Sequence, residues 1–457
     1  MKLVAVLLFG FALPACAHME KGRGHDSVSH LVESRSGHRT GWEQGSPEAR
    51  QIQERVNALL KGGLNRERAV QIALINNPHL QETYDELDVS QADLVQAGLL
   101  SNPTLSGSIG FQLGHASGRP EYEVSIVQSF LDIFMLPLRK RVAEAQFDAD
   151  TLRVAHAALQ VAAETSKEFV ELQTSEQTVE LMRNIAASAD AAASLAEKQF
   201  EAGNINQRAV ASERAASAQA ELDLAHDQLT VLEHRERLNR LLGLWGANSG
   251  WQSAQPLQAI PSSEAPLEHL EVTALKQRLD VEAARKQVEM MDSALSMART
   301  SRYTGLVNVG AHVHQDADGP RLAGPTLSLE LPIFDQRQAL IGRLEAQRRQ
   351  AQRRLDALGL DVRSEVRLAK AQLDLNRHAA EQYLNALLPL RRTVLEQSEL
   401  EYNAMQIGLY ELLATKRSEI ETFRAYLNTV RDYWLAHAEL ERALGGRITS
   451  PRPGSHQ

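Results

Sequence analysis

The chain has 457 residues, and its 49 basic and 58 acidic side chains leave a net charge of −9. This balance offers no basic surface for nucleic acid, so no nucleic-acid partner is expected. Alanine, leucine, glutamine, glutamate and arginine dominate the middle of the chain, and aromatic residues make up only 5%. This composition is typical of long packed helices and argues against several ordinary domains.

The N-terminus has the pattern of an export signal. Lys2 supplies a positive charge, an apolar stretch follows, and a Leu-Pro-Ala-Cys run ends at Cys16, the only cysteine. This run resembles a bacterial lipobox, so we expect 1–15 to be a lipoprotein signal peptide and Cys16 to be acylated. Pro14 departs from the usual lipobox residue, and an ordinary signal peptide cut near Ala17 is the alternative. Ala17, rather than aspartate, indicates the outer membrane.

The next part of the chain predicts a tether followed by two helices. Residues 16–64 are polar and rich in glycine, serine and histidine, and they predict an irregular segment without a core. Helical apolar spacing begins at Arg66 and is interrupted by an Asn-Asn-Pro run. Asn77 can cap the following helix and Pro78 can occupy its first turn; this helix is expected to reach about Leu100.

Four segments then have strand periodicity. Apolar and polar residues alternate over about 103–113 and 122–131, and a loop rich in glycine, serine and proline joins the two. The same pattern returns over about 305–314 and 326–333. Each pair predicts a hairpin with one apolar face and one polar face.

A very long helix is predicted after each hairpin. These helices cover about 138–200 and 340–402, and at 1.5 Å per residue each would be about 90 Å long. Such lengths require coiled-coil-like neighbours. The return helices are shorter and cover about 206–243 and 408–444. Helices before the hairpins, at about 66–100 and 270–301, add to them end to end, so that each pair matches the length of one long helix.

Roughly the last two thirds of the chain is one segment written twice. Phe200–Ile205 matches Tyr402–Ile407 at an offset of 202 residues, and the shared register predicts two copies of one structural unit. The predicted organisation is a signal peptide at 1–15, a tether at 16–64, a first repeat at 65–244, a linker at 245–269, a second repeat at 270–446 and a tail at 447–457.

Several motifs within this plan resemble the TolC-type outer-membrane factor family, lipoprotein type, over nearly the entire mature chain. They are the Ala-Leu-Ile-Asn-Asn-Pro run at 73–78, the Gln-Ala-Gly-Leu-Leu-Ser-Asn-Pro-Thr-Leu run at 96–105, and the turn motif that starts at Phe200 and again at Tyr402. The resemblance implies a mostly α fold with a small β part. Three chains would form an outer-membrane β-barrel of twelve strands, four per chain, continued by a long α-helical barrel with a mixed equatorial region.

The resemblance also implies a function. Such a homotrimer is the outer-membrane exit duct of a multi-component efflux system, lipid-anchored and extending into the periplasm. Its partners would be a periplasmic adaptor (membrane fusion protein), an inner-membrane pump of the resistance-nodulation-division type, and outer-membrane lipid. The four predicted strands also favour a trimer. An open sheet edge in lipid leaves backbone groups without hydrogen bonds, so other copies of the chain must close the sheet into a barrel. The alternative is an elongated coiled-coil periplasmic lipoprotein, an adaptor or tether without a channel, which needs no apolar outer band.

Neither an enzyme nor a cofactor is predicted, because no catalytic constellation or cofactor motif stands out. Asn308, His312 and His314 fall in the polar phase of their strand and are candidates for the channel lumen. The two histidines could contact a passing metal ion. Two ligands without a fixed third make a poor site, however, so the alternative is that polar lumen positions simply accept histidine.

The resemblance further implies a gate at the periplasmic end, closed by acidic residues just past each turn motif. Nine residues beyond the motif aromatics stand Ala209 in the first copy and Glu411 in the second. The first copy departs from the acidic pattern, so we expect one carboxylate ring with a basic partner. Arg208 is the first candidate for that partner and Lys416 the second. Alternatively, these are solvated charges worth less than about 1 kcal/mol as a pair.

Overall fold

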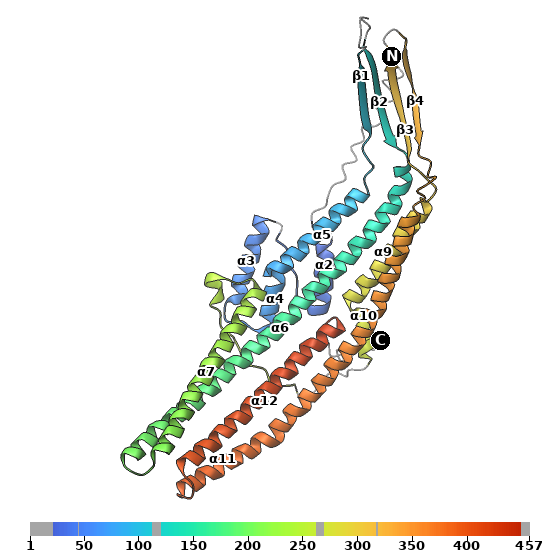
Figure 1. Cartoon of the computed structure of the whole chain (residues 1–457). Coiled ribbons are helices and arrows are strands. Elements are labelled where there is room, and N and C mark those ends of the chain that lie inside the picture. The colour runs from blue at the N-terminus through green and yellow to red at the C-terminus, as the bar shows by residue number, and fades with distance from the viewer. Residues whose placement is uncertain (1–21, 44, 112–119, 262–268, 317–318, 449–457) are drawn as a thin grey trace, which may run out of the picture. The chain divides into compact units, whose positions relative to one another are not determined.

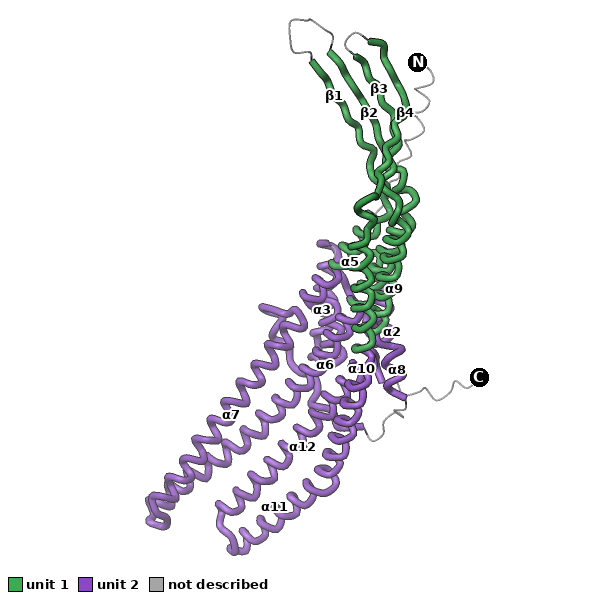
Figure 2. The backbone as a smooth tube through the Cα atoms, turned by 45° about the vertical axis from the view of Figure 1, so that its right-hand side comes forward, with its two compact units in different colours: residues 1–26, 85–153, 280–358 green, residues 27–84, 154–279, 359–457 purple. Residues whose placement is uncertain are grey.

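A computed structural model describes residues 22–43, 45–111, 120–261, 269–316 and 319–448. The chain forms two compact units, each assembled from segments that are distant in sequence (Figure 2). Unit 1 comprises Met1–Asp26, Asp85–Arg153 and Asp280–Leu358, and unit 2 comprises Ser27–Tyr84, Val154–Leu279 and Gly359–Gln457.

Unit 1 contains a four-stranded antiparallel sheet whose strands lie side by side in chain order (Figure 1). The strands are β1 (Thr104–Gly110), β2 (Glu121–Ser129), β3 (Val307–Gln315) and β4 (Arg321–Leu329). β4 begins at Arg321, earlier than the start near 326 that the sequence predicts. Its first half contains Gly324 and Pro325, which interrupt the alternation of apolar and polar side chains that marks a strand.

The edge of the sheet accounts for Pro325. The backbone N–H of Glu330 donates to the carbonyl of Leu306 at 2.9 Å, so these two residues form a hydrogen-bonded pair at the end of the β3–β4 ladder. Hydrogen-bonded and non-hydrogen-bonded pairs alternate in antiparallel sheets, so Pro325, opposite Ala311, stands at a non-hydrogen-bonded position. The nitrogen of Pro325 therefore points to the outer side of β4, away from β3. The β3–β4 ladder needs no N–H donor at that position.

Four helices of unit 1 follow the order of the strands (Figure 1). They are α5 (Pro78–Ala97), the upper part of α6 (Leu131–Glu201), α9 (Leu279–Thr300) and the start of α10 (Gln338–Gln382). Polar contacts join each to the next: Ser90 of α5 bonds Asp150 of α6 at 2.8 Å, Arg153 of α6 bonds Gln287 of α9 at 3.1 Å, and Arg299 of α9 pairs with Glu345 of α10 at 2.7 Å.

Unit 2 contains the rest of the long helices and two helical hairpins. α6 and α7 (Gln207–Leu242) form the first hairpin; α10, a π turn at Tyr383–Leu387, α11 (Leu388–Asn403) and α12 (Leu409–Leu444) form the second. α6 is continuous for 71 residues, while its counterpart is interrupted by the π turn. Gly243 and Gly445 end the two return helices with φ of 64° and 78°, a left-handed conformation that glycine adopts readily.

The core of unit 2 lies where α3 (Ser46–Leu60), α4 (Arg66–Asn76) and α7 meet α6. Phe169 and Leu172 of α6 are buried there with Leu238 of α7 and Trp251 of the linker. Asn77 caps α5, because its side chain accepts a hydrogen bond from the N–H of Leu80 at 3.0 Å. The side-chain amide of Asn77 also donates to the carbonyl of Leu241, so one residue connects the helices.

The N-terminal segment is more ordered than the irregular tether that its composition predicts. It contains α2 (His25–Ser36) and α3, with Val28 and Val32 of α2 fully buried. His38 lies 3.0 Å from Glu67 of α4, and the guanidinium of Arg447 lies 2.5 Å from the same carboxylate. The hydrogen bond with His38 and the charge of Arg447 lower the pKa of Glu67 to about 2. Tertiary contacts of this kind are invisible to composition alone.

Candidate functional site

The two faces of the sheet in unit 1 have opposite chemistry. In an antiparallel sheet, cross-strand partners share a face, so the register assigns every side chain. The apolar face carries Leu105, Ile109, Val124, Ile126, Val309, Val313, Leu327 and Leu329, with Gln128, Gln315 and Arg321 as its polar members. The polar face carries Ser106, Ser108, Glu123, Ser125, Asn308, His312, His314, Thr326 and Ser328, with Val127 and Leu322 as its apolar members.

The three residues predicted for the lumen share the polar face. Asn308, His312 and His314 are each partly buried, whereas Val309 on the other face keeps 44% of its surface exposed. Glu123 stands directly opposite His314 across the β2–β3 pair and adds a carboxylate that sequence reasoning did not single out. Glu123 falls in the polar phase of β2, so the alternation could have revealed it.

The histidines have different surroundings. One ring nitrogen of His314 lies 2.6 Å from a carboxylate oxygen of Asp316. The ring of His312 lies near Gly324 of β4, and within the described part of the chain its Nδ1 is buried without a hydrogen-bond partner. No group of three or more histidine, cysteine, aspartate or glutamate side chains is arranged to hold a metal ion among the residues that the structure describes. The protomer therefore presents potential ligands but no assembled metal centre.

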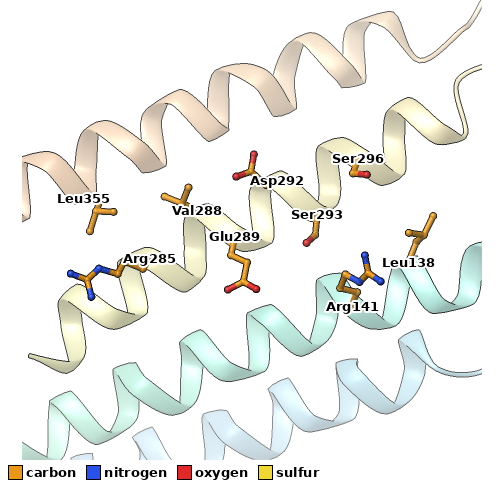
Figure 3. A pocket seen from close by; sticks show the side chains of 9 residues that line it. All are labelled: Leu138, Arg141, Arg285, Val288, Glu289, Asp292, Ser293, Ser296 and Leu355. Atoms are coloured by element: carbon orange, nitrogen blue, oxygen red, sulfur yellow. The ribbon is translucent and has the colours of Figure 1, made fainter. Parts of the chain in front are cut away.

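A cavity of about 490 Å³ lies along the helices of unit 1 (Figure 3). Arg141 of α6, Arg285 of α9 and Leu355 of α10 contribute to its lining, and α9 supplies two carboxylates. Both carboxylates have cationic partners: Glu289 pairs with Lys286 at 3.2 Å, and Asp292 pairs with Arg348. The cavity thus has compensated charges.

The gate candidates lie near the ends of the helical hairpins in unit 2. Glu411 and Arg208 are exposed, and neither forms an ion pair within the described ranges of this single chain. Lys416 pairs with Glu419 on its own helix at 2.5 Å, so the structure does not bring it to Glu411. The protomer alone therefore places these charges on its surface and leaves them available to a neighbouring molecule.

A different contact joins the two hairpins at this end. The hydroxyl of Tyr410 donates to the side-chain oxygen of Gln199 in α6 at 2.9 Å. Burial, followed by the nearby Glu213 carboxylate, raises the pKa of Tyr410, so its hydroxyl stays a donor. Sequence reasoning missed this bond, although Tyr410 occupies the same place in the second repeat as Arg208 in the first.

Two further findings concern membrane attachment. In the described ranges, no helix combines the length and hydropathy needed to cross a membrane. Cys16, the predicted lipid attachment site, lies outside the described residues.

The chain is similar to known proteins in sequence. The family described as "Outer membrane efflux protein" matches residues 69–244, which correspond to the first predicted repeat. The cobalt-zinc-cadmium resistance protein CzcC of Cupriavidus metallidurans is 26% identical over 402 residues, which cover 84% of this chain and 90% of that protein.

Solved structures share the fold. The outer membrane channel CmeC of Campylobacter jejuni superposes with a TM-score of 0.71 at 15% identity, over 89% of each chain. A membrane protein of Pseudomonas aeruginosa superposes with a TM-score of 0.72 at 18% identity, over 83% of this chain and 92% of that one. The predicted fold class is confirmed: the chain has the fold of a TolC-type outer-membrane factor, and its residues 69–244 match the outer membrane efflux protein family.

Proposed function

We propose that three copies of this efflux protein close into one outer-membrane exit duct that passes solutes from the periplasm, or from an inner-membrane pump, to the exterior. The two-faced sheet is the observation that carries the proposal. Among the described residues, its outer strands β1 and β4 each have a partner on one side only, and lipid cannot satisfy the remaining backbone groups. Three sheets of four strands would supply twelve strands, with the polar faces lining a lumen.

Aromatic side chains at both ends of the sheet support a membrane position. Phe130, Phe134, Tyr303 and Phe334 are all at least 46% exposed near the helical end. At the other end, Phe111 is 73% exposed and Tyr122 begins the apolar face of β2. Exposed aromatic residues on both sides of an apolar band are typical of outer-membrane strands. A channel-less coiled-coil tether would have no use for this band.

The ends of the helical hairpins are the proposed docking site for a periplasmic adaptor, which would connect the duct to an inner-membrane pump of the resistance-nodulation-division type. Met405 is 93% exposed, and Phe200 and Leu400 nearby are 45% and 60% exposed. Exposed apolar groups gathered at one end are typical of a protein contact. Met405 also has φ of 59°, a left-handed value that is uncommon for a residue other than glycine.

Divalent transition-metal cations are the proposed cargo. The relative CzcC is described as a cobalt-zinc-cadmium resistance protein. The polar face of the sheet carries His312, His314 and Glu123, whose imidazole and carboxylate groups bind such ions transiently when no complete ligand set holds them. Weak binding suits a channel, because an ion must leave as readily as it enters.

The first prediction tests the membrane position of the sheet. Val309→Arg places a charge on the apolar face and should destabilise the protein folded in lipid vesicles by about 2–4 kcal/mol if this position lies near the bilayer midplane. Asn308→Arg is the matched control at the same depth on the polar face, and its cost should be much smaller. Urea titration of folding into vesicles measures both; equal costs at the two positions would contradict the proposed orientation.

The second prediction concerns the periplasmic gate. We propose that Glu411 of each copy forms a carboxylate ring, with Arg208 as its basic partner across the contact between neighbouring helix pairs and Lys416 as the second candidate. Glu411→Ala and Arg208→Ala should each raise the resting conductance of the purified trimer in a planar bilayer, because either change removes one side of the closing contact.

Glu421→Ala is the control for the gate, since Glu421 is also exposed on α12 but lies about 15 Å further along the helix. Its resting conductance should equal that of the natural protein. Unchanged conductance in both gate variants, with the trimer intact, would refute the assignment of these residues and leave the duct itself unaffected.

The third prediction tests the cargo. Zn²⁺ added to the open channel should reduce its conductance reversibly, and His312→Ala combined with His314→Ala should weaken this block. Asn308→Ala is the control and should retain the block. If Zn²⁺ blocks the double variant and the natural channel equally, the histidines do not contact the cargo.

The fourth prediction concerns the lipid anchor. We propose that Cys16 carries the lipid and begins the mature chain, because a lone cysteine in an exported protein has no intramolecular disulfide partner. Cys16→Ser should abolish palmitate labelling, while insertion through the strands continues. Mass spectrometry of the N-terminal peptide checks this, and an unmodified N-terminus downstream of Cys16 would disprove it.

A further inference from the structure

We propose that the copies join along a charge-matched helix contact, in which the carboxylate face of α5 in one protomer packs against the arginine face of α10 in the next. The partner is therefore a second copy of this chain. This inference rests on the proposed trimer and adds to it the residues, the polarity and the register of the contact.

The order of elements in unit 1 determines which helices can meet. The contacts within the unit join α5 to α6, α6 to α9 and α9 to α10. α5 and α10 are thus the outer helices, as β1 and β4 are the outer strands. If β1 of one copy pairs with β4 of the next, α5 meets α10 of that same neighbour. α5 runs toward the sheet and α10 away from it, so the two helices meet antiparallel.

The free face of α10 is basic and has a small-residue centre. Arg343, Arg349 and Arg353 are exposed on it, and none of the three forms an ion pair among the residues that the structure describes. Arg348, by contrast, turns toward α9 and pairs with Asp292. The three free arginines line a shallow groove of about 510 Å³ whose lining also includes Ala346. A small residue between long cationic ones leaves room for an inserted side chain.

The free face of α5 has the complementary chemistry. This helix contains no lysine or arginine, and Glu86 and Asp93 are exposed on it. Neither carboxylate has an ion-pair partner in the described part of the chain. Val89 stands between them and is 65% exposed, while Tyr84 and Leu87 on the other side of α5 are fully buried. An exposed valine flanked by unpaired carboxylates matches a groove lined by alanine and unpaired arginines.

These groups lie at matching distances from the ends of their helices that are nearest the sheet. At 1.5 Å per residue from the ends nearest the sheet, Asp93 lies about 6 Å below the end of α5 and Arg343 about 7.5 Å below the start of α10. By the same count, Val89 and Ala346 each lie at about 12 Å. Glu86 and Arg349 each lie at about 16 Å. When the two ends nearest the sheet meet at one level, Asp93 opposes Arg343, Val89 opposes Ala346 and Glu86 opposes Arg349.

This pattern favours the correct neighbour over the incorrect one. Two α10 faces would oppose arginine to arginine, and two α5 faces would oppose carboxylate to carboxylate, so only α5 on α10 is attractive. Each exposed ion pair contributes little by itself. The repeated charges determine which helices pair and how α5 and α10 are aligned. The contact of Val89 with Ala346 supplies the apolar packing.

Cross-linking tests the register. Val89→Cys combined with Ala346→Cys should give disulfide-linked dimers and trimers of the membrane-inserted protein on mild oxidation, because a disulfide needs Cβ atoms about 4 Å apart. Val89→Cys with Ala357→Cys, about 16 Å further along α10, is the control and should stay uncross-linked. Cross-linking of the control pair in place of the first pair would overturn the register.

Charge exchange tests the chemistry. Glu86→Arg with Asp93→Arg, or Arg343→Glu with Arg349→Glu, should lower the trimer-to-monomer ratio about tenfold in native mass spectrometry, and the four changes together should restore it. If the natural chain is a conducting trimer but the exchanges have no effect and the first cysteine pair does not cross-link, this contact is wrong and the duct stands. If the natural chain forms no trimer, the proposed function itself fails.

Discussion

The unpaired backbone of β1 and β4 is the constraint on which the rest of the molecule depends. A four-stranded sheet with an apolar face is suited to lipid, yet its two outer strands expose N–H and C=O groups that lipid cannot bind. Other copies of the chain must satisfy those groups. The helices of unit 1 follow the strands in the same order. The outer helices α5 and α10 therefore each have a face without a neighbour in the described part of the chain, as the outer strands do.

Much of the fold could be predicted from the sequence because its signals are long and repeated. The alternation of apolar and polar residues marks β1, β2 and β3, and the offset of 202 residues marks the two halves. The N-terminal helices α2 and α3 were missed because their composition is polar. Val28, Val32 and Val56 are buried, and single buried residues in a polar segment give no periodic signal.

The residues of the candidate site could be predicted where the alternation of side chains along a strand decides which face of the sheet they occupy. Asn308, His312 and His314 share a face because their spacing is even, and the same argument applies to Glu123. The link between Tyr410 and Gln199 was not predictable, because it joins helices whose relative rotation is set by packing around Met182 and Ile185. Glu411 and Arg208 are a different case. The sequence identifies them as charged candidates, but within the described ranges of a single chain neither forms an ion pair.

Pro325 has a consequence for the chain before it assembles. In the proposed exit duct, a newly exported protomer would reach the membrane with β4 uncovered, and a complete row of N–H donors there would pair with any extended segment it met. Proline removes one donor near the middle of that row, on the side that faces away from β3. The uncovered strand is thereby a poorer template for chance aggregation on its way to the membrane. The cost is one missing backbone hydrogen bond per copy in the finished ring, where the packing of whole neighbouring sheets and helices can compensate for it.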